Sequence, residues 1–247
     1  MCIRDRGLYG YLEDTGDPIR LRLLEGGTFE VSYSDVASIS AASGVVRGGR
    51  FWREERTHLN NLIGPTGNTL PAGVWTLAAY EIFLPVAYYG VSDALTIGFG
   101  TPLIWSFLAG YDATRLSYGA VKARIYKKER ISVAVGSLIL GSKNYVMGVG
   151  FAALTWTGDD GSFTAAAGVG PGKEGEWGSA LAMLSGSYRT GRTTKLVGEL
   201  YSVPGNNGTL VPSAAVRLFG DRLSVDFGAL AVPDYRLIPL LNFKYVF

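Results

Sequence analysis

Apolar and mixed positions alternate over residues 235–247, up to the last residue of the printed chain. Because successive side chains of a strand point to opposite faces, this alternation predicts one long β-strand with an apolar face and a mixed face. The apolar face, counted back from the end, carries Phe247, Tyr245, Phe243, Leu241, Pro239, Leu237 and Tyr235. The mixed face carries Val246, Lys244, Asn242, Leu240, Ile238 and Arg236.

Strand-like patterns continue backward to residue 57 and predict about twelve strands. Most of the predicted strands are ten residues or longer, whereas strands of globular proteins have a mode of ~5–6 residues. A tilted strand needs about 9–11 residues to cross a bilayer, so the lengths favour a transmembrane antiparallel β-barrel over a soluble β-sandwich. The predicted spans are 57–64, 73–89, 92–101, 113–127, 130–141, 144–157, 161–170, 176–190, 193–203, 208–219, 222–232 and 235–247.

The last strand resembles the C-terminal strand of bacterial outer-membrane β-barrels, because its apolar residues end on an aromatic one. The resemblance implies that this strand closes the barrel. It also implies that Phe243, Tyr245 and Phe247 form an assembly signal, read by the barrel assembly machinery. The expected surroundings are outer-membrane lipid.

Connections between the predicted strands alternate between two kinds. Short ones fall at residues 90–93, 127–130, 158–161, 189–192 and 220–221, and longer or Pro/Gly-rich ones at 64–72, 102–112, 141–144, 170–176, 204–208 and 232–234. Bacterial barrels place short turns in the periplasm and longer loops outside. With an even strand count, the C-terminus and the segment before the barrel are both expected in the periplasm.

Residues 60–100 resemble an uncharacterised family of bacterial outer-membrane barrels. The resemblance implies the fold and the location but no activity. The residues that carry it are Gly64, Pro65, Thr66, Leu70, Gly73, Tyr89, Gly90, Val91 and Asp93.

The chain before residue 57 is predicted to hold a separate module. Residues 7–41 contain short strand candidates with the acidic turn and Gly-Gly turn of small SH3-like or Sm-like barrels, which they resemble. Residues 42–56 are rich in Gly and Arg and are interpreted as a linker, with contact to acidic lipid head groups as the alternative. The opening M-C-I-R-D-R resembles translated adapter sequence on a truncated gene, so a signal peptide is expected upstream.

Composition narrows the classes further. The 247 residues include 34 Gly and only 18% charged residues, and no stretch approaches the ~18 apolar residues of a membrane helix. A net charge of +2 gives no sign of nucleic-acid binding. The single cysteine, Cys2, excludes an intrachain disulfide and a Cys-based metal cluster.

Strand faces assign a set of ionisable residues to the lumen, with basic residues in excess. For example, Glu81 lies opposite the apolar face of the predicted strand 73–89. A cationic lumen favours anionic or polar solutes, while the alternative is a packed interior in which charges pair. The assigned set is Glu81, Lys122, Arg124, Lys195, Glu199, Arg217, Asp226, Arg236 and Lys244.

The sequence therefore predicts an outer-membrane barrel that acts as a channel for small polar or anionic solutes. The alternative is a structural or binding barrel with a closed lumen, which holds a partner through its loops or its N-terminal module. An enzyme is not expected, because His58 is the single histidine and no G-x-S-x-G motif is present. No cofactor and no metal are predicted, and neither solute nor partner is named by the residues.

The terminal strand gives a first testable prediction. Deleting Phe247, or replacing both Phe243 and Tyr245 with Asp, should leave the chain unassembled in the periplasm, because the apolar aromatic face is lost. Heat-modifiable mobility in gels measures assembly, and normal mobility of both variants would contradict the assigned role. Replacing the short-turn residue Asp221 with Asn is the control and should not change assembly.

Overall fold

The computed structural model describes residues 9–24, 26–36, 38–39, 43–81, 84–101, 117–141, 146–171, 177–203, 209–232 and 235–247. The chain divides into two compact units, Met1–Glu55 and Arg56–Phe247. Residues 1–6, interpreted above as adapter sequence, lie outside the described part. Within the described residues, no helix is long and apolar enough to cross a bilayer.

The first unit contains two small antiparallel sheets. One has the order β1 (Gly10–Asp14), β2 (Ile19–Leu23) and β3 (Thr28–Val31), followed by a 3-10 turn, η2 (Tyr33–Asp35). In β2 the alternation buries Ile19, while Arg20 reaches Glu30 at 2.8 Å across the sheet. The unit fits the predicted small β module, and its likeness to SH3-like barrels stays a prediction.

The predicted linker 42–56 is not simply a linker. It contains a hairpin of β4 (Gly44–Arg47) and β5 (Arg50–Arg53), which turns at two glycines with φ of 55° and 72°. Composition alone suggested a solvated segment, but the buried ring of Phe51 stacks on Tyr9 with centroids 4.7 Å apart. The aromatic residues therefore give this Gly- and Arg-rich segment a packed side.

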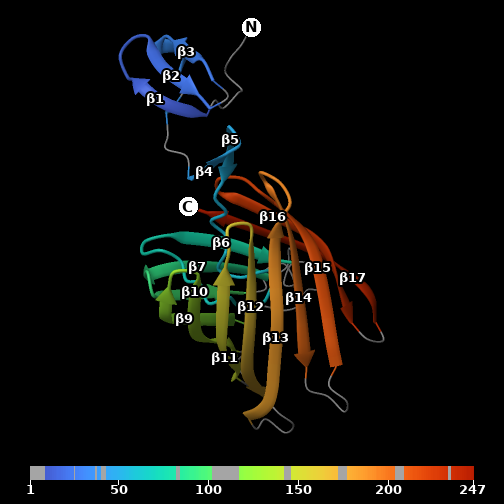
Figure 1. The fold of residues 1–247 in the computed structure, drawn as a ribbon. Coiled ribbons are helices and arrows are strands. Elements are labelled where there is room, and N and C mark those ends of the chain that lie inside the picture. Colours follow the sequence, from blue (N-terminus) through green and yellow to red (C-terminus); the bar gives the residue numbers. More distant parts are fainter. Residues whose placement is uncertain are drawn as a thin grey trace, which may run out of the picture. The chain divides into compact units, whose positions relative to one another are not determined.

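The second unit is a closed antiparallel barrel in which twelve strands follow one another in chain order (Figure 1). It confirms the predicted fold class. The ring closes between the last strand and the first, where Phe243 pairs with Ala79 and Val246 with Thr76. The strands are β6 (Trp75–Tyr80), β7 (Leu84–Ser92), β8 (Leu95–Gly100), β9 (Ser117–Lys128), β10 (Ile131–Gly141), β11 (Val146–Thr157), β12 (Gly161–Pro171), β13 (Trp177–Arg189), β14 (Thr194–Val203), β15 (Thr209–Phe219), β16 (Leu223–Val232) and β17 (Tyr235–Val246).

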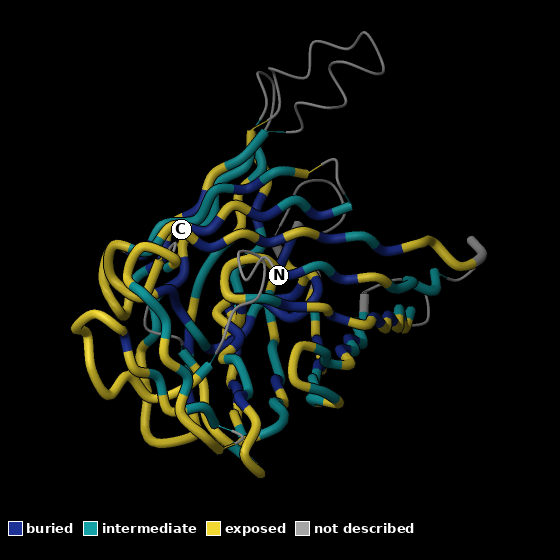
Figure 2. The backbone as a smooth tube through the Cα atoms, turned by 90° about the horizontal axis from the view of Figure 1, so that it is seen from above, coloured by how far each residue is buried: buried dark blue, intermediate teal, exposed yellow. Residues whose placement is uncertain are grey.

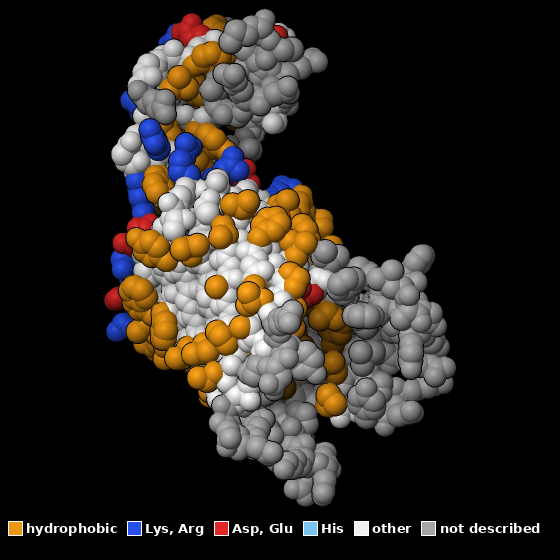
Figure 3. Space-filling model, turned by 90° about the vertical axis from the view of Figure 1, so that its right-hand side faces the viewer, with side chains coloured by type: hydrophobic (Ala, Val, Ile, Leu, Met, Phe, Trp, Pro, Cys, Tyr) orange, Lys and Arg blue, Asp and Glu red, His pale blue; other side chains and the backbone are white. Residues whose placement is uncertain are grey.

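Buried and exposed residues alternate along the barrel strands, which Figure 2 shows as changing colours along each tube. In β15 the pattern is nearly strict, with Ser213, Ala215, Arg217 and Phe219 buried and the residues between them accessible. The outward positions are mostly apolar, and hydrophobic side chains line the wall seen in Figure 3. An apolar outer surface is what a barrel needs against lipid chains.

Exposed aromatic residues gather at the end of the barrel that carries the short turns. Trp75 packs on Tyr89 with ring centroids 4.5 Å apart, and Tyr245 meets Phe247 edge-on at 4.8 Å. Aromatic side chains favour the boundary between lipid and water, because their rings are apolar and carry polar groups. Other exposed aromatics near this end are Tyr126, Trp156, Phe163 and Tyr188.

Two predicted strands are wrong, although the total of twelve is right. Residues 57–64 form no strand, and the predicted strand 73–89 is split into β6 and β7 by a turn at Glu81, whose φ is 51°. The first barrel strand thus starts from the short-turn end. The segment 64–72, predicted as an outer loop, belongs instead to the chain that fills the barrel.

Candidate functional site

Residues 57–73, called the plug here, cross the inside of the barrel before β6 begins. They form irregular backbone, yet Leu62 and Leu70 are almost completely buried. Leu62 packs with Val197, Ala215 and Leu240 of the wall. Buried irregular backbone must find hydrogen-bond partners, because no water is available to it. The partners of the plug therefore define the site.

The middle of the plug is a tight loop over residues 59–66. Asn60 and Pro65 form an isolated antiparallel bridge, and the Asn61 amide donates to the Gly64 carbonyl at 3.2 Å. The Thr66 hydroxyl donates to the Leu59 carbonyl at 2.8 Å and so ties the two ends of the loop together. These contacts within the loop bring its two ends together.

Three buried cations of the wall bind main-chain carbonyls of the plug. Lys122 on β9 donates to Leu59 at 2.7 Å and to Thr66 at 3.3 Å. Lys244 on β17 donates to Asn61 at 2.7 Å, and Arg217 on β15 donates to the same carbonyl. Hydrogen bonds from charged donors are stronger than neutral ones, so these contacts hold the loop firmly.

Asp226 on β16 balances two of the three cations. It accepts Nε of Arg217 at 2.5 Å and Nη2 at 2.8 Å, and it lies 3.8 Å from Nζ of Lys244. The side chains of all three residues are at most 4% exposed. A buried ionic cluster of this kind is stable only while each charge keeps its partners.

Glu199 on β14 holds the tip of the plug. Its carboxylate accepts the consecutive amides of Leu62 at 2.7 Å, Ile63 at 3.2 Å and Gly64 at 3.1 Å, and the Tyr201 hydroxyl donates to it at 2.5 Å. Three successive amides aimed at one anion form a nest. A Cβ at position 64 would overlap the Met183 sulphur and the Tyr201 hydroxyl, so a larger residue there would displace both side chains.

The remaining plug residues run along β11, β10 and β8 toward β6. The Gly67 amide donates to Thr155 at 2.8 Å, Asn68 accepts from Ser132 at 2.9 Å, and the Leu70 amide donates to Thr96 at 2.9 Å.

The β7–β8 turn fixes the end of the plug. Ala72 donates its amide to the Asp93 carboxylate at 2.9 Å, and Gly73 donates to Gly90 at 2.8 Å. A Cβ at Gly90 would overlap the Pro71 carbonyl, so the close approach requires a glycine.

Wall and plug together fill the inside of the barrel with buried side chains. Each of the twelve strands contributes at least one inward side chain that is buried. In an empty barrel of this width, inward side chains would face water instead. A barrel of this size is wider than the eight-stranded barrels that wall side chains fill unaided. The buried residues, one from each strand in chain order, are Tyr80, Val86, Thr96, Lys122, Ser132, Thr155, Thr164, Ser185, Glu199, Arg217, Asp226 and Lys244.

Five residues of the assigned lumenal set meet at the plug: Lys122, Glu199, Arg217, Asp226 and Lys244. Arg124 and Lys195 are half-buried, and Lys195 lies 5.9 Å above the Phe219 ring. Arg236 lies in β17, but its side chain is outside the described part. The C-terminal aromatics Phe243, Tyr245 and Phe247 are exposed on the outer side.

Glu81 does not lie in the middle of a strand, as predicted, but in the β6–β7 turn. Its amide donates to Asn242 at 3.1 Å, and partial burial raises the pKa of its carboxyl. The apolar face of the predicted strand turns inward, where Asn60 donates to Tyr80 at 2.5 Å. Asn60, Asn61 and Asn242 thus bind inside the barrel, and none was assigned to a site. The adjacent pair Asn60-Asn61, polar yet surrounded by apolar residues, was a usable signal.

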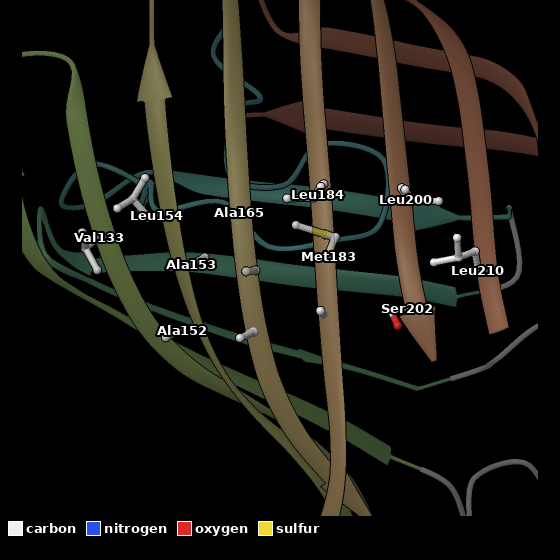
Figure 4. Close-up of a pocket in the computed structure, with 13 residues that line it drawn as sticks. Val133, Ala152, Ala153, Leu154, Ala165, Met183, Leu184, Leu200, Ser202 and Leu210 are labelled. Atoms are coloured by element: carbon white, nitrogen blue, oxygen red, sulfur yellow. The ribbon is translucent and has the colours of Figure 1, made fainter. Parts of the chain in front are cut away.

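The outer face of the barrel wall carries an apolar pocket. A pocket of about 420 Å³ lies along β10 to β15 and is lined mainly by alanine and leucine (Figure 4). Leu154, Leu184 and Leu210 at this pocket are about half exposed, so it opens on the outer face of the wall. It has no charged lining residue. Among the described residues no group of acidic, His or Cys side chains could hold a metal.

No protein-family model and no curated protein sequence matches the chain. Among solved structures, it is similar to the KdgM porin in complex with disordered oligogalacturonate, with a TM-score of 0.50, 9% identity, and coverage of 70% of this chain and 98% of that one. It also matches the NanC porin (TM-score 0.44, 10% identity, 71% and 98% covered) and a Rh. blastica porin mutant (0.42, 13%, 66% and 55%). The KdgM match shows that the chain has the fold of outer-membrane porins.

The ionic cluster at the plug gives a testable prediction. Asp226→Ala leaves Arg217 and Lys244 buried without their carboxylate and should destabilise the barrel by about 3–5 kcal/mol. Asp159→Ala removes the exposed ion pair with Arg130 and should cost within about 1 kcal/mol. Urea unfolding in detergent, followed by heat-modifiable mobility, measures both. Equal effects of the two substitutions would show that the buried cluster does not hold the barrel together.

Proposed function

We propose that the protein is an outer-membrane channel for small polar or anionic solutes, closed at rest by the plug. The observation that carries this proposal is the mode of attachment of the plug. Its loop is tied by its own hydrogen bonds, and apart from the apolar contact of Leu62 the wall holds it mostly through polar groups that water or a solute would also satisfy. A segment held in this way is separable from the barrel without unfolding it.

Charge supports the preference for anions. The wall groups that hold the plug comprise three cations, Lys122, Arg217 and Lys244, and two anions, Glu199 and Asp226. Once the loop leaves, these side chains face the lumen with an excess of positive charge. Rings of cationic side chains select anions, because they lower the electrostatic cost of bringing a negative charge into a narrow pore.

A second function is a closed barrel that binds a partner through its loops or its N-terminal module. The burial of an inward side chain on each of the twelve strands favours it, because a filled interior leaves little room for a solute. The two proposals differ in a single property. A channel must conduct when the plug is loosened, whereas a structural barrel only loses stability.

Orientation is part of the proposal. The short turns, the start of the plug and Phe247 share one end of the barrel, where Thr57 contacts Ser224 and the Phe247 amide donates to Trp75 at 2.9 Å. We place this end in the periplasm, together with the N-terminal module, as bacterial barrels place their short turns. Labelling of a cysteine at Asp93 from the periplasmic side is the expected result.

Loosening the plug tests the channel function. A Cβ at Gly67 would overlap the backbone carbonyl of Ser132, so Gly67→Val should push the plug away from β10. A loss of about 1.4 kcal/mol in plug binding corresponds to about tenfold more open time. In planar bilayers we expect rare openings of the wild type, and frequent steady openings with anion preference in Gly67→Val.

Gly141→Val is the matched control, because a Cβ at Gly141 meets no atom within 4 Å. Its currents should equal those of the wild type. Lys122→Glu in the Gly67→Val background should weaken the anion preference. Folded Gly67→Val that passes no current would reject the channel and support the closed binding barrel.

A further inference from the structure

Lys122 differs from the other charged groups that hold the plug. Its side chain is 6% exposed, and its ammonium contacts the carbonyl oxygens of Leu59 and Thr66. No carboxylate of the described residues lies within ion-pair distance of it. Lys122 is therefore a buried cation held by neutral acceptors alone.

The remaining charges at the plug are each compensated. Arg217 and Lys244 share the Asp226 carboxylate, and the negative charge of Glu199 is met by three amides and a hydroxyl. Burying an ion without a counter-ion costs several kcal/mol, which hydrogen bonds to carbonyls offset only in part. The site around Lys122 thus lacks one negative charge.

Lys122 also lies where the two ends of the plug loop meet. Leu59 begins the loop and Thr66 ends it, and one ammonium binds both carbonyls. An anion that replaces these carbonyls gains a direct Coulomb attraction in a site of low dielectric, where such attraction is strong. The same exchange removes the wall contact from both ends of the loop at once.

We propose that Lys122 is an anion-binding site that competes with the plug, so that a small anion such as phosphate or a carboxylate promotes plug release. The inference rests on the proposed function. In it, the anions that the channel passes are also the signal that opens the channel. Binding and release are linked, because an anion that binds the released state more tightly than the closed state shifts the equilibrium toward release.

Plug release is measurable without any current. Leu62 belongs to the plug loop and is fully buried, and Cys2 is the single native cysteine. In a Cys2→Ser, Leu62→Cys barrel in liposomes, the rate of modification by a neutral maleimide reports release. Inorganic phosphate is titrated against gluconate at constant ionic strength. We expect the rate to rise several-fold with phosphate and then to saturate.

Variants of Lys122 test whether the phosphate dependence of the labelling rate arises at this residue. Lys122→Gln should make the rate independent of phosphate, whereas Lys122→Arg, which keeps the positive charge, should retain the dependence. Lys127→Gln is the control, because this lysine lies near the end of β9 and its side chain is exposed. Heat-modifiable mobility confirms that each barrel is folded, and Lys122→Arg keeps the test valid if Lys122→Gln does not assemble.

A rate that phosphate leaves unchanged in the wild-type background would overturn the inference, as would an unchanged phosphate dependence in Lys122→Gln. Either result leaves the channel function standing if Gly67→Val conducts. Conversely, phosphate-dependent labelling together with a silent Gly67→Val barrel would reject the channel and keep the anion site.

Discussion

The plug and the charged wall each need the other to be buried. A loop without regular secondary structure exposes main-chain amides and carbonyls, and a wall that carries Lys122, Arg217, Lys244, Glu199 and Asp226 exposes charges. The carbonyls of the loop accept from the cations and its amides donate to the carboxylate of Glu199. Buried polar groups are tolerated only when they are paired. This reciprocal pairing is the constraint on which the filled interior depends.

The pairing also links the two sides of the barrel wall. Outward positions are apolar and suit lipid, while inward positions suit a polar main chain, and the same strands supply both by alternation. Gly67 and Gly90 allow the backbones of plug and wall to approach each other more closely than a side chain at either position would permit. We therefore expect substitutions at these glycines to weaken the binding of the plug more than the stability of the barrel.

Much of the barrel could be predicted from the sequence, because strand alternation is a local pattern. The long strands from β9 to β17 follow directly from it, as does the inward direction of Lys122, Glu199 and Arg217. The plug could not be predicted in this way. The apolar and polar positions of residues 57–64 alternate enough to suggest a strand. That their last amides bind Glu199 instead depends on a wall residue far away in the sequence. The break at Glu81 likewise depends on a positive φ that alternation does not reveal.

The residues that suggested a barrel family have a structural role that the motif did not reveal. Gly64, Pro65, Thr66 and Leu70 belong to the plug, while Gly90 and Asp93 form the turn on which it docks. The motif residues thus belong to one contact between two segments that lie apart in the sequence, the plug and the β7–β8 turn. The structural role of the motif could be recognised only from the contact between the two segments.

The central claim is that the plug occupies the lumen of the resting protein, with its tip held by Glu199. Hydrogen exchange of the Leu62 and Gly64 amides in the native barrel tests it most directly, because these amides donate to a buried carboxylate. The account predicts protection similar to that of the amides of β14 and β15, and faster exchange of both in Glu199→Gln. Exchange of the two wild-type amides at the rate of an open peptide would contradict the account.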